Sequence, residues 1–402
     1  MKKRIVVAVL LVVFASALGF ASEELEIFTY LYNAAESPAD QLGILQSVME
    51  MKIPGAGSFY QSALSKLVRQ YPAIKQRNRS AEVEDADSLA LILAESLGSE
   101  KQVSSAADIW RIANPTEGGS ENPLVKAEAF MALGKMRSPE HLPKVIKVLE
   151  DLNARPVRGD PVGAERTAYG AILSLEKYGD PSGYLPVFFA SVGWYSDRIK
   201  GQAAQSCSFI LKDPSDQMMN IIRGQGYTPA QKLGALRNVE KSSDIANPKK
   251  SEIAVAGITW GWTTNPRNNN ERATVATLRK ESMQMIAKYG TSDSSVYPQL
   301  QKSYASQGLD RSERLLSIGT LKTLKTDQAA QLLNQFLADL NSQQKAGSAV
   351  NKQENEVMAR EIIPALGTIA NSSSRPFLVN VASSNWGSTV DTLARDALSK
   401  IR

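Results

Sequence analysis

The side chains best suited to catalysis are scarce in this sequence. His141 is the only histidine and Cys207 is the only cysteine. A Ser-His-Asp triad would have to be built on His141, which we expect in a solvated position or in an N-terminal polar position of a helix. Cys207 lies near Ala203, Ala204 and Phe209, where we expect a small buried side chain rather than a reactive thiol. One histidine and one cysteine far apart also argue against a transition-metal site, and we expect no cofactor.

Acidic residues gather in two places, residues 23–26 and residues 82–87. Both lie where we expect helices to begin, and the helix dipole favours negative charge there. Neither has the spacing of a calcium loop, and the sequence contains no phosphate-binding loop of the GxxxxGK[ST] or GxGxxG type. A glycosidase pair of carboxylates stays open, because distance in the fold defines such a pair. The sequence therefore predicts no catalytic residue.

Two clusters combine tryptophan, tyrosine and arginine, the residue types that dominate protein-binding hot spots. These clusters supply six candidate partner-binding residues: Trp194, Tyr195, Arg198, Trp260, Trp262 and Arg267. In a helix, the two rings of a W-x-W motif cannot lie on one face, so we expect one in the core and the other exposed. Simple packing is the competing interpretation of both clusters.

A repeated pair of amphipathic helices carries these residues. The clearest copy is residues 125–152, VKAEAFMALGKMRSPEHLPKVIKVLEDL. In its first half, apolar residues recur at helical spacing, and the alanines among them predict close approach of a neighbouring helix. Ser138 and Pro139 predict a turn followed by a new helix, with Ser138 as the N-cap and Pro139 as the first helical residue. The second half places Val145 and Leu149 on an apolar face opposite charged residues.

The pattern V-K-x-x-A-x-x-A-L-G, a turn, and L-P-x-V-I-x-x-L resembles the HEAT repeat. Lys126 stands where that family commonly has arginine, and Leu133 and Gly134 match its Leu-Gly. L-G-K-M-R-S-P from Leu133 aligns with L-E-K-Y-G-D-P from Leu175, a spacing of 175 − 133 = 42 residues. HEAT arrays repeat at roughly 40 to 47 residues. The resemblance covers about residues 37–402 and implies antiparallel helix pairs, stacked in a right-handed superhelix that binds other macromolecules.

We therefore expect an all-α fold, an α-solenoid of HEAT-like or armadillo-like helix pairs. The only β-leaning run is residues 253–262. The expected organisation is a signal peptide over residues 1–21, an N-terminal cap with degenerate repeats over 22–122, and the HEAT-like array with a C-terminal capping helix over 123–402. A repeat array grows by stacking, so 402 residues need not split into globular domains.

The N-terminus has the composition of a signal peptide. Basic residues 2–4 precede an apolar stretch, residues 5–14, and then a run of small residues. We expect cleavage after Ala21, with cleavage after Ala17 as the alternative. The apolar stretch is too short to span a bilayer, so no membrane span is expected after cleavage. These features predict a periplasmic or secreted protein.

Loss of this leader changes the electrostatic balance. The formal net charge falls from +5 to +2, because Lys2, Lys3 and Arg4 are removed. Charges of both signs are interspersed along the rest of the chain, and no basic run is longer than Lys249-Lys250. Nucleic-acid binding therefore has little electrostatic support, and we expect no nucleic-acid partner.

Together these observations predict an exported, non-catalytic HEAT-repeat scaffold or adaptor that binds a protein partner in the periplasm or cell envelope. A structural part of an envelope machine is one special case. The alternative is an exported helical-superhelix enzyme that acts on cell-wall glycan. We rank it second, because no region free of the helix-pair pattern is large enough for an added catalytic domain.

Overall fold

The computed structural model describes residues 23–156, 158–306, 308–346 and 352–401. Every regular element among these residues is a helix, and residues 253–262 belong to one of them. The expected all-α architecture is therefore confirmed. The segment expected to be a signal peptide, residues 1–21, lies outside the described residues.

The chain divides into two compact units, residues 1–212 (unit 1) and residues 213–402 (unit 2). The boundary expected from sequence, between residues 122 and 123, falls inside unit 1. No helix among the described residues is long and apolar enough to cross a membrane.

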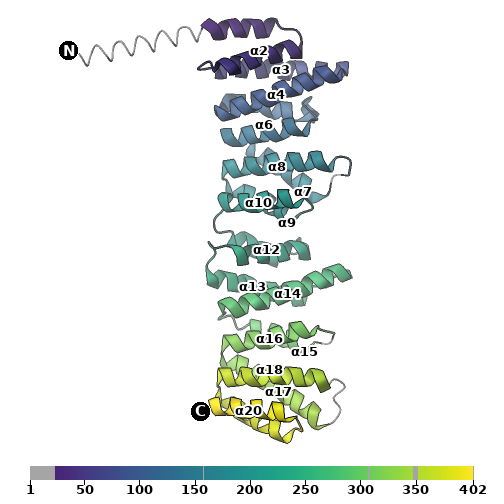
Figure 1. The fold of residues 1–402 in the computed structure, drawn as a ribbon, viewed down its shortest axis with the longest axis vertical. Coiled ribbons are helices and arrows are strands. Elements are labelled where there is room, and N and C mark those ends of the chain that lie inside the picture. Colours follow the sequence, from purple (N-terminus) through teal and green to yellow (C-terminus); the bar gives the residue numbers. More distant parts are fainter. Residues whose placement is uncertain (1–22, 157, 307, 347–351, 402) are drawn as a thin grey trace, which may run out of the picture. The chain divides into compact units, whose positions relative to one another are not determined.

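Unit 1 is a stack of helices in two layers (Figure 1). One layer contains α2, α4, α6, α8 and α10, and the connecting helices α3, α5, α7 and α9 pack behind it. The helices are residues 23–34, α2 Pro38–Met51, α3 Gly57–Arg77, α4 Ser80–Ser99, α5 Ala106–Ala113, α6 Pro123–Met136, α7 Leu142–Ala154, α8 Pro161–Tyr178, α9 Tyr184–Val192 and α10 Asp197–Ile210, with short 3-10 turns at Val103–Ser105, Pro115–Glu117 and Pro181–Gly183.

Small residues allow α6 and α8 to pack closely. Ala129 and Ala132 of α6 are fully buried, as the alanine pattern predicted. A Cβ atom on Gly170 of α8 would lie 2.4 Å from the Cα atom of Ala127, closer than packed atoms approach. Glycine at this position therefore sets the spacing of the two helices.

The helices of the front layer begin with strong start signals. Asn122 caps α6 through its side chain, which accepts a hydrogen bond from the N–H of Leu124. Asp160 caps α8 in the same way by accepting from the N–H of Gly163, at 2.8 Å. A proline occupies the first turn of both helices, where its missing N–H has no intrahelical partner to lose. This arrangement places the second residues of α6 and α8, Leu124 and Val162, at equivalent positions.

The turn after α6 differs from the sequence prediction. Helix α7 begins at Leu142, three residues later than Pro139. Ser138 does not cap it, because the Oγ atom of Ser138 lies 2.8 Å from Nδ1 of His141. His141 is only 3% exposed, and its ring packs near that of Trp110 with centroids 6.2 Å apart. His141 therefore stands at the N-terminus of α7, as one of the two expected alternatives had it, but the other alternative, a solvated ring, is wrong because the turn buries the ring.

Unit 2 repeats the two-layer arrangement. Helices α12, α14, α16, α18 and α20 form one layer, and α11, α13, α15, α17 and α19 form the other. The bounds are α11 Ser215–Arg223, α12 Pro229–Lys241, α13 Asn247–Thr263, α14 Asn269–Tyr289, α15 Val296–Ala305, α16 Arg311–Leu324, α17 Asp327–Lys345, α18 Lys352–Ile369, α19 Arg375–Val379 and α20 Ser388–Lys400, with 3-10 turns at Ser372–Ser374 and Asn380–Ser383.

Candidate interaction groove

The first aromatic cluster, Trp194 and Tyr195, lies between α9 and α10. The indole N–H of Trp194 donates to the carbonyl of Leu152 at 2.9 Å, and the hydroxyl of Tyr195 donates to Asn153 Oδ1 at 3.0 Å. The two rings stack with centroids 4.3 Å apart, and Tyr195 is 2% exposed. Both side chains therefore hold the α9–α10 connection against the end of α7.

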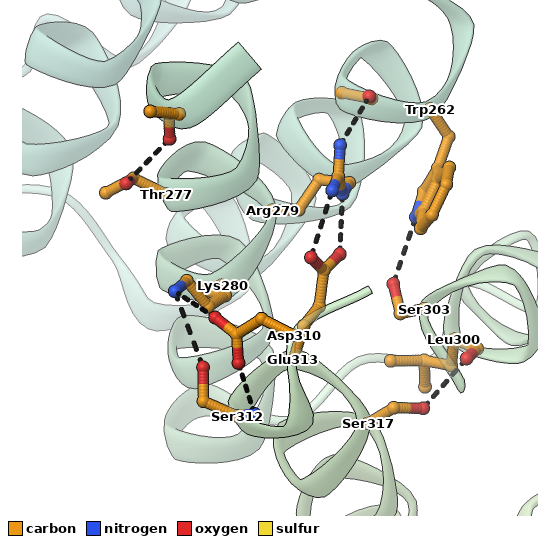
Figure 2. A network of polar contacts seen from close by, with 12 residues as sticks. Trp262, Thr277, Arg279, Lys280, Leu300, Ser303, Asp310, Ser312, Glu313 and Ser317 are labelled. Carbon is orange, nitrogen blue, oxygen red and sulfur yellow. Dashed lines mark hydrogen bonds and ion pairs between the residues drawn. The ribbon is translucent and has the colours of Figure 1, made fainter. Parts of the chain in front are cut away.

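Trp262, in the second cluster, belongs to a buried polar network (Figure 2). The guanidinium of Arg279 lies 4.2 Å from the centroid of the Trp262 ring, and the indole N–H donates to Ser303 Oγ at 3.0 Å. Arg279 also donates to both carboxylate oxygens of Glu313, at 2.6 and 2.9 Å. In this pair Glu313 is 3% exposed and Arg279 is 11% exposed, so the pair is buried. The network contains one side chain from each of α13, α14, α15 and α16 and therefore connects these four helices in the interior of unit 2.

Trp260 contacts a different part of unit 2. Its ring lies 4.6 Å from Nζ of Lys232, a fully buried lysine. Lys232 donates to the carbonyls of Ile221, Ile222 and Gly224, at 2.7, 2.5 and 2.5 Å, at the end of α11. Burial lowers the pKa of Lys232 to about 8. Trp260 also lines a cavity of about 330 Å³ between α13 and the start of α15.

The two rings of the W-x-W motif are both partly buried, each against a different cation. The expectation of one core ring and one exposed ring is therefore wrong. The reason is that Lys232 and Arg279 approach α13 from different sides, which no local pattern reveals. Arg267 is exposed in the loop before α14, where its backbone N–H donates to Glu271 Oε2 at 2.8 Å.

Arg198 is the candidate residue that lines an open groove. This groove, of about 550 Å³, crosses the front layer of unit 1 and is named here the α6–α8 groove. Figure 1 shows the four helices that form it, α4, α6, α8 and α10, as successive rungs of that layer. Its lining residues are Leu91, Leu124, Ala127, Glu128, Met131, Val162, Glu165, Arg166, Tyr169, Arg198 and Ile199.

Two apolar residues that line the groove are exposed to solvent. Leu124 is 45% exposed and Val162 is 61% exposed, although most large apolar side chains of these helices are buried. Tyr169 lies beside them, with the guanidinium of Arg198 5.6 Å from its ring centroid. Tyrosine and arginine are residue types that dominate protein-binding hot spots, and the exposed Leu124 and Val162 add apolar surface of the kind that marks interaction sites.

Some charged side chains of the groove have hydrogen-bond partners within the protein, and others have none among the described residues. Glu165 accepts from the backbone N–H and the hydroxyl of Ser196, at 2.6 and 2.8 Å, so both of its oxygens serve the start of α10. The side chains of Arg166 and Arg198 are exposed, and neither guanidinium forms an ion pair or hydrogen bond with another described residue. The charged groups without an ion-pair partner next to α8 and α10 are therefore positive.

A second cleft in unit 1, of about 420 Å³, lies between α5, α6, α7 and α8. Trp110, Phe130 and Lys126 line it, and burial, the largest cause, lowers the pKa of Lys126. Its carboxylates are engaged elsewhere: Glu121 pairs with Lys75 at 3.0 Å, and Asp151 pairs with Lys147 at 2.7 Å, while Asp160 caps α8.

The residues that could support catalysis or metal binding lie apart. Burial, followed by the charge of Lys144, lowers the pKa of His141. Cys207 is buried, as predicted, and burial raises the pKa of its thiol to about 12. No group of three or more histidine, cysteine or acidic side chains is placed to hold a metal ion within the described part of the chain. Asp87, expected at a helix start, is instead buried in α4, where it accepts from the hydroxyls of Tyr71 and Ser120.

Sequence reasoning found Arg198 but missed the other residues of the groove. The signal that could have found them is the repeated helix start Pro-Leu and Pro-Val, at Pro123 and Pro161. Both place an apolar residue at the second helical position, and these two residues, Leu124 and Val162, are exposed and outside the core. Recognising this required knowing that α6 and α8 are neighbours.

Comparisons with known proteins give little further guidance. No family model matches the chain, and no characterised protein resembles it significantly in sequence. Among solved structures, human deoxyhypusine hydroxylase in complex with glycerol aligns over 78% of this chain and 98% of its own, with 12% identity and a TM-score of 0.25. At that similarity neither its fold nor its activity carries over to this chain.

Proposed function

We propose that this protein is an exported, non-catalytic scaffold that binds a protein partner through the α6–α8 groove. The observation that carries the proposal is the exposed pair Leu124 and Val162, flanked by the unpaired side chains of Arg166 and Arg198. The leader-like composition of residues 1–21 supports a location in the periplasm or outside the cell.

The rigid setting of the groove supports binding without chemistry. Its side chains project from four packed helices, so little conformational freedom is lost when a partner docks. A groove of about 550 Å³ has room for several partner side chains. In this proposal, complementarity of shape and charge provides specificity.

The proposal is tested with a photo-crosslinking amino acid at residue 162 of the full chain, in cells that naturally make the protein. We expect one or a few defined protein adducts. The matched control carries the crosslinker at Glu150, an exposed residue of α7 in the other helix layer. Adducts shared by the two positions, or none at residue 162, would contradict protein binding at the groove.

A second test changes the other exposed apolar residue of the groove. The variant L124E, made in the protein that carries the crosslinker at residue 162, should lose the adducts and keep the helical circular dichroism of the parent, because the Leu124 side chain is 45% exposed. Unchanged adducts in a folded L124E protein would show that binding occurs elsewhere.

The cell-wall glycan enzyme is the alternative, and the 420 Å³ cleft is the observation in its favour, because it combines carboxylates with Trp110. A general acid needs a raised pKa, whereas the ion pair with Lys75 lowers the pKa of Glu121. This alternative predicts that the purified protein releases soluble fragments from cell-wall glycan and that D151N/D160N abolishes the release. Our proposal predicts no release by either protein.

A further inference from the structure

The α6–α8 groove has two differently charged flanks. Arg166 of α8 and Arg198 of α10 lie on one flank, and Glu128 of α6 lies on the other. Glu128 is partly balanced by Lys135, whose Nζ lies 3.9 Å from its carboxylate. Neither arginine has a counterpart of this kind among the described residues.

The remaining carboxylate on the arginine flank does not neutralise them. Glu165 directs both oxygens to Ser196, at 2.6 and 2.8 Å, which leaves no carboxylate oxygen turned to Arg166 or Arg198 within ion-pair distance. Arginine readily forms two parallel hydrogen bonds with a carboxylate, and its planar group also packs on aromatic rings. The guanidinium of Arg198 already contacts the ring of Tyr169, and this contact leaves its N–H groups available for a ligand.

The two exposed apolar residues of the groove limit what the ligand can be. Leu124 and Val162 occupy equivalent positions on neighbouring helices, so they present two adjacent apolar contacts in a row across the layer. A ligand that covers both needs apolar side chains on one face and acidic side chains at the edge that meets the arginines. An amphipathic helix meets this requirement with residues at spacings of three and four.

We infer that the α6–α8 groove docks an amphipathic segment of a partner protein, with leucine-like side chains on Leu124 and Val162 and aspartate or glutamate side chains on Arg166 and Arg198. This inference rests on the proposed function and specifies the partner. Because the arginines are exposed, their contribution falls with increasing salt.

The test is a selection from a displayed library of random peptides about 16 residues long, carried out on the full chain at low and high salt. We expect selected peptides to combine apolar residues at helical spacing with aspartate or glutamate. The charge-reversed double variant R166E/R198E should bind those peptides about 10- to 100-fold more weakly, and should itself select peptides rich in lysine or arginine.

Two control variants make the result specific. R166K/R198K keeps the charge and should keep the acidic preference with a smaller loss of affinity. R272E/K322E makes the same change of net charge in unit 2, at exposed positions without ion pairs among the described residues, and should select the same peptides as the parent.

Several outcomes would overturn the inference. The first is that peptides are enriched no more on the parent than on the control variant V162E. The second is that the selected peptides lack acidic residues. The third is that the parent and R166E/R198E select the same peptides. If crosslinks form at residue 162 while the peptides lack acidic residues, the proposed function stands and this inference fails. If both experiments are negative, both proposals fail.

Discussion

The buried ion pair between Arg279 and Glu313 provides the sharpest test of how unit 2 is held together (Figure 2). Replacing Glu313 by leucine should lower the free energy of unfolding by about 3 to 5 kcal/mol. The reason is that Arg279, 11% exposed in the pair, would keep only the carbonyl of Gly261 at 3.3 Å and the ring of Trp262 as partners. A guanidinium withdrawn from water without a carboxylate is costly.

The structure supplies a matched surface pair for comparison. Arg237 binds Glu281 with a similar two-pronged geometry, but Arg237 is 51% exposed. E281L should therefore cost about 1 kcal/mol or less, because water screens this pair and can replace either partner. The contrast between E313L and E281L isolates burial from hydrogen-bond geometry.

The double variant R279M/E313L completes the design. With both charges replaced by apolar side chains of similar size, the stability should return to within about 1 kcal/mol of the parent. The assay is urea unfolding followed by circular dichroism, with hydrogen exchange of α14 and α16 to locate the effect. The reasoning is refuted if E313L costs no more than E281L, or if the double variant is as unstable as E313L.

Three further predictions concern packing and burial. The pKa of Lys232 is lowered to about 8, below its unfolded value near 10.4, so the unfolded state binds more protons than the folded state between these pH values. The free energy of unfolding of the parent minus that of K232M, measured by urea unfolding, should therefore rise by about 1 kcal/mol from pH 7 to pH 9. A constant or falling difference would be inconsistent with the lowered pKa. G170A should destabilise by about 1 to 3 kcal/mol, because its Cβ would meet Ala127, whereas G201A has open space and should stabilise slightly in the same assay; equal effects would refute the close contact. With a thiol pKa of about 12, Cys207 should react with a maleimide at pH 8 at least about 1000-fold more slowly in the folded protein than in urea, and rapid labelling without urea would show that it is accessible.

Local pattern was sufficient to predict an all-helical chain built from stacked helix pairs, although it placed the start of α7 three residues too early. Apolar residues at helical spacing, together with the start signals at Asn122 and Asp160, act over a few residues and are readable in one sequence. Cys207 is buried as expected, on the same helix face as the buried Ala203, but Ala204 and Phe209, the other two neighbours behind that expectation, are exposed. The failure at His141 marks the limit, because the turn that buries it depends on contact with Trp110 from another helix.

The groove was decided by tertiary structure. Leu124 and Val162 are 38 residues apart (162 − 124), and they become one surface because Gly170 lets α8 approach α6. The charge of that surface likewise depends on which groups already have partners. Both carboxylate oxygens of Glu165 accept hydrogen bonds from Ser196, whereas the Arg166 guanidinium has no ion-pair partner among the described residues. Helix formation depends on neighbours along the chain, whereas exposure and pairing depend on neighbours in space. For this reason the sequence predicts a repeat architecture, and only the packed helices define which apolar and charged side chains share an exposed surface.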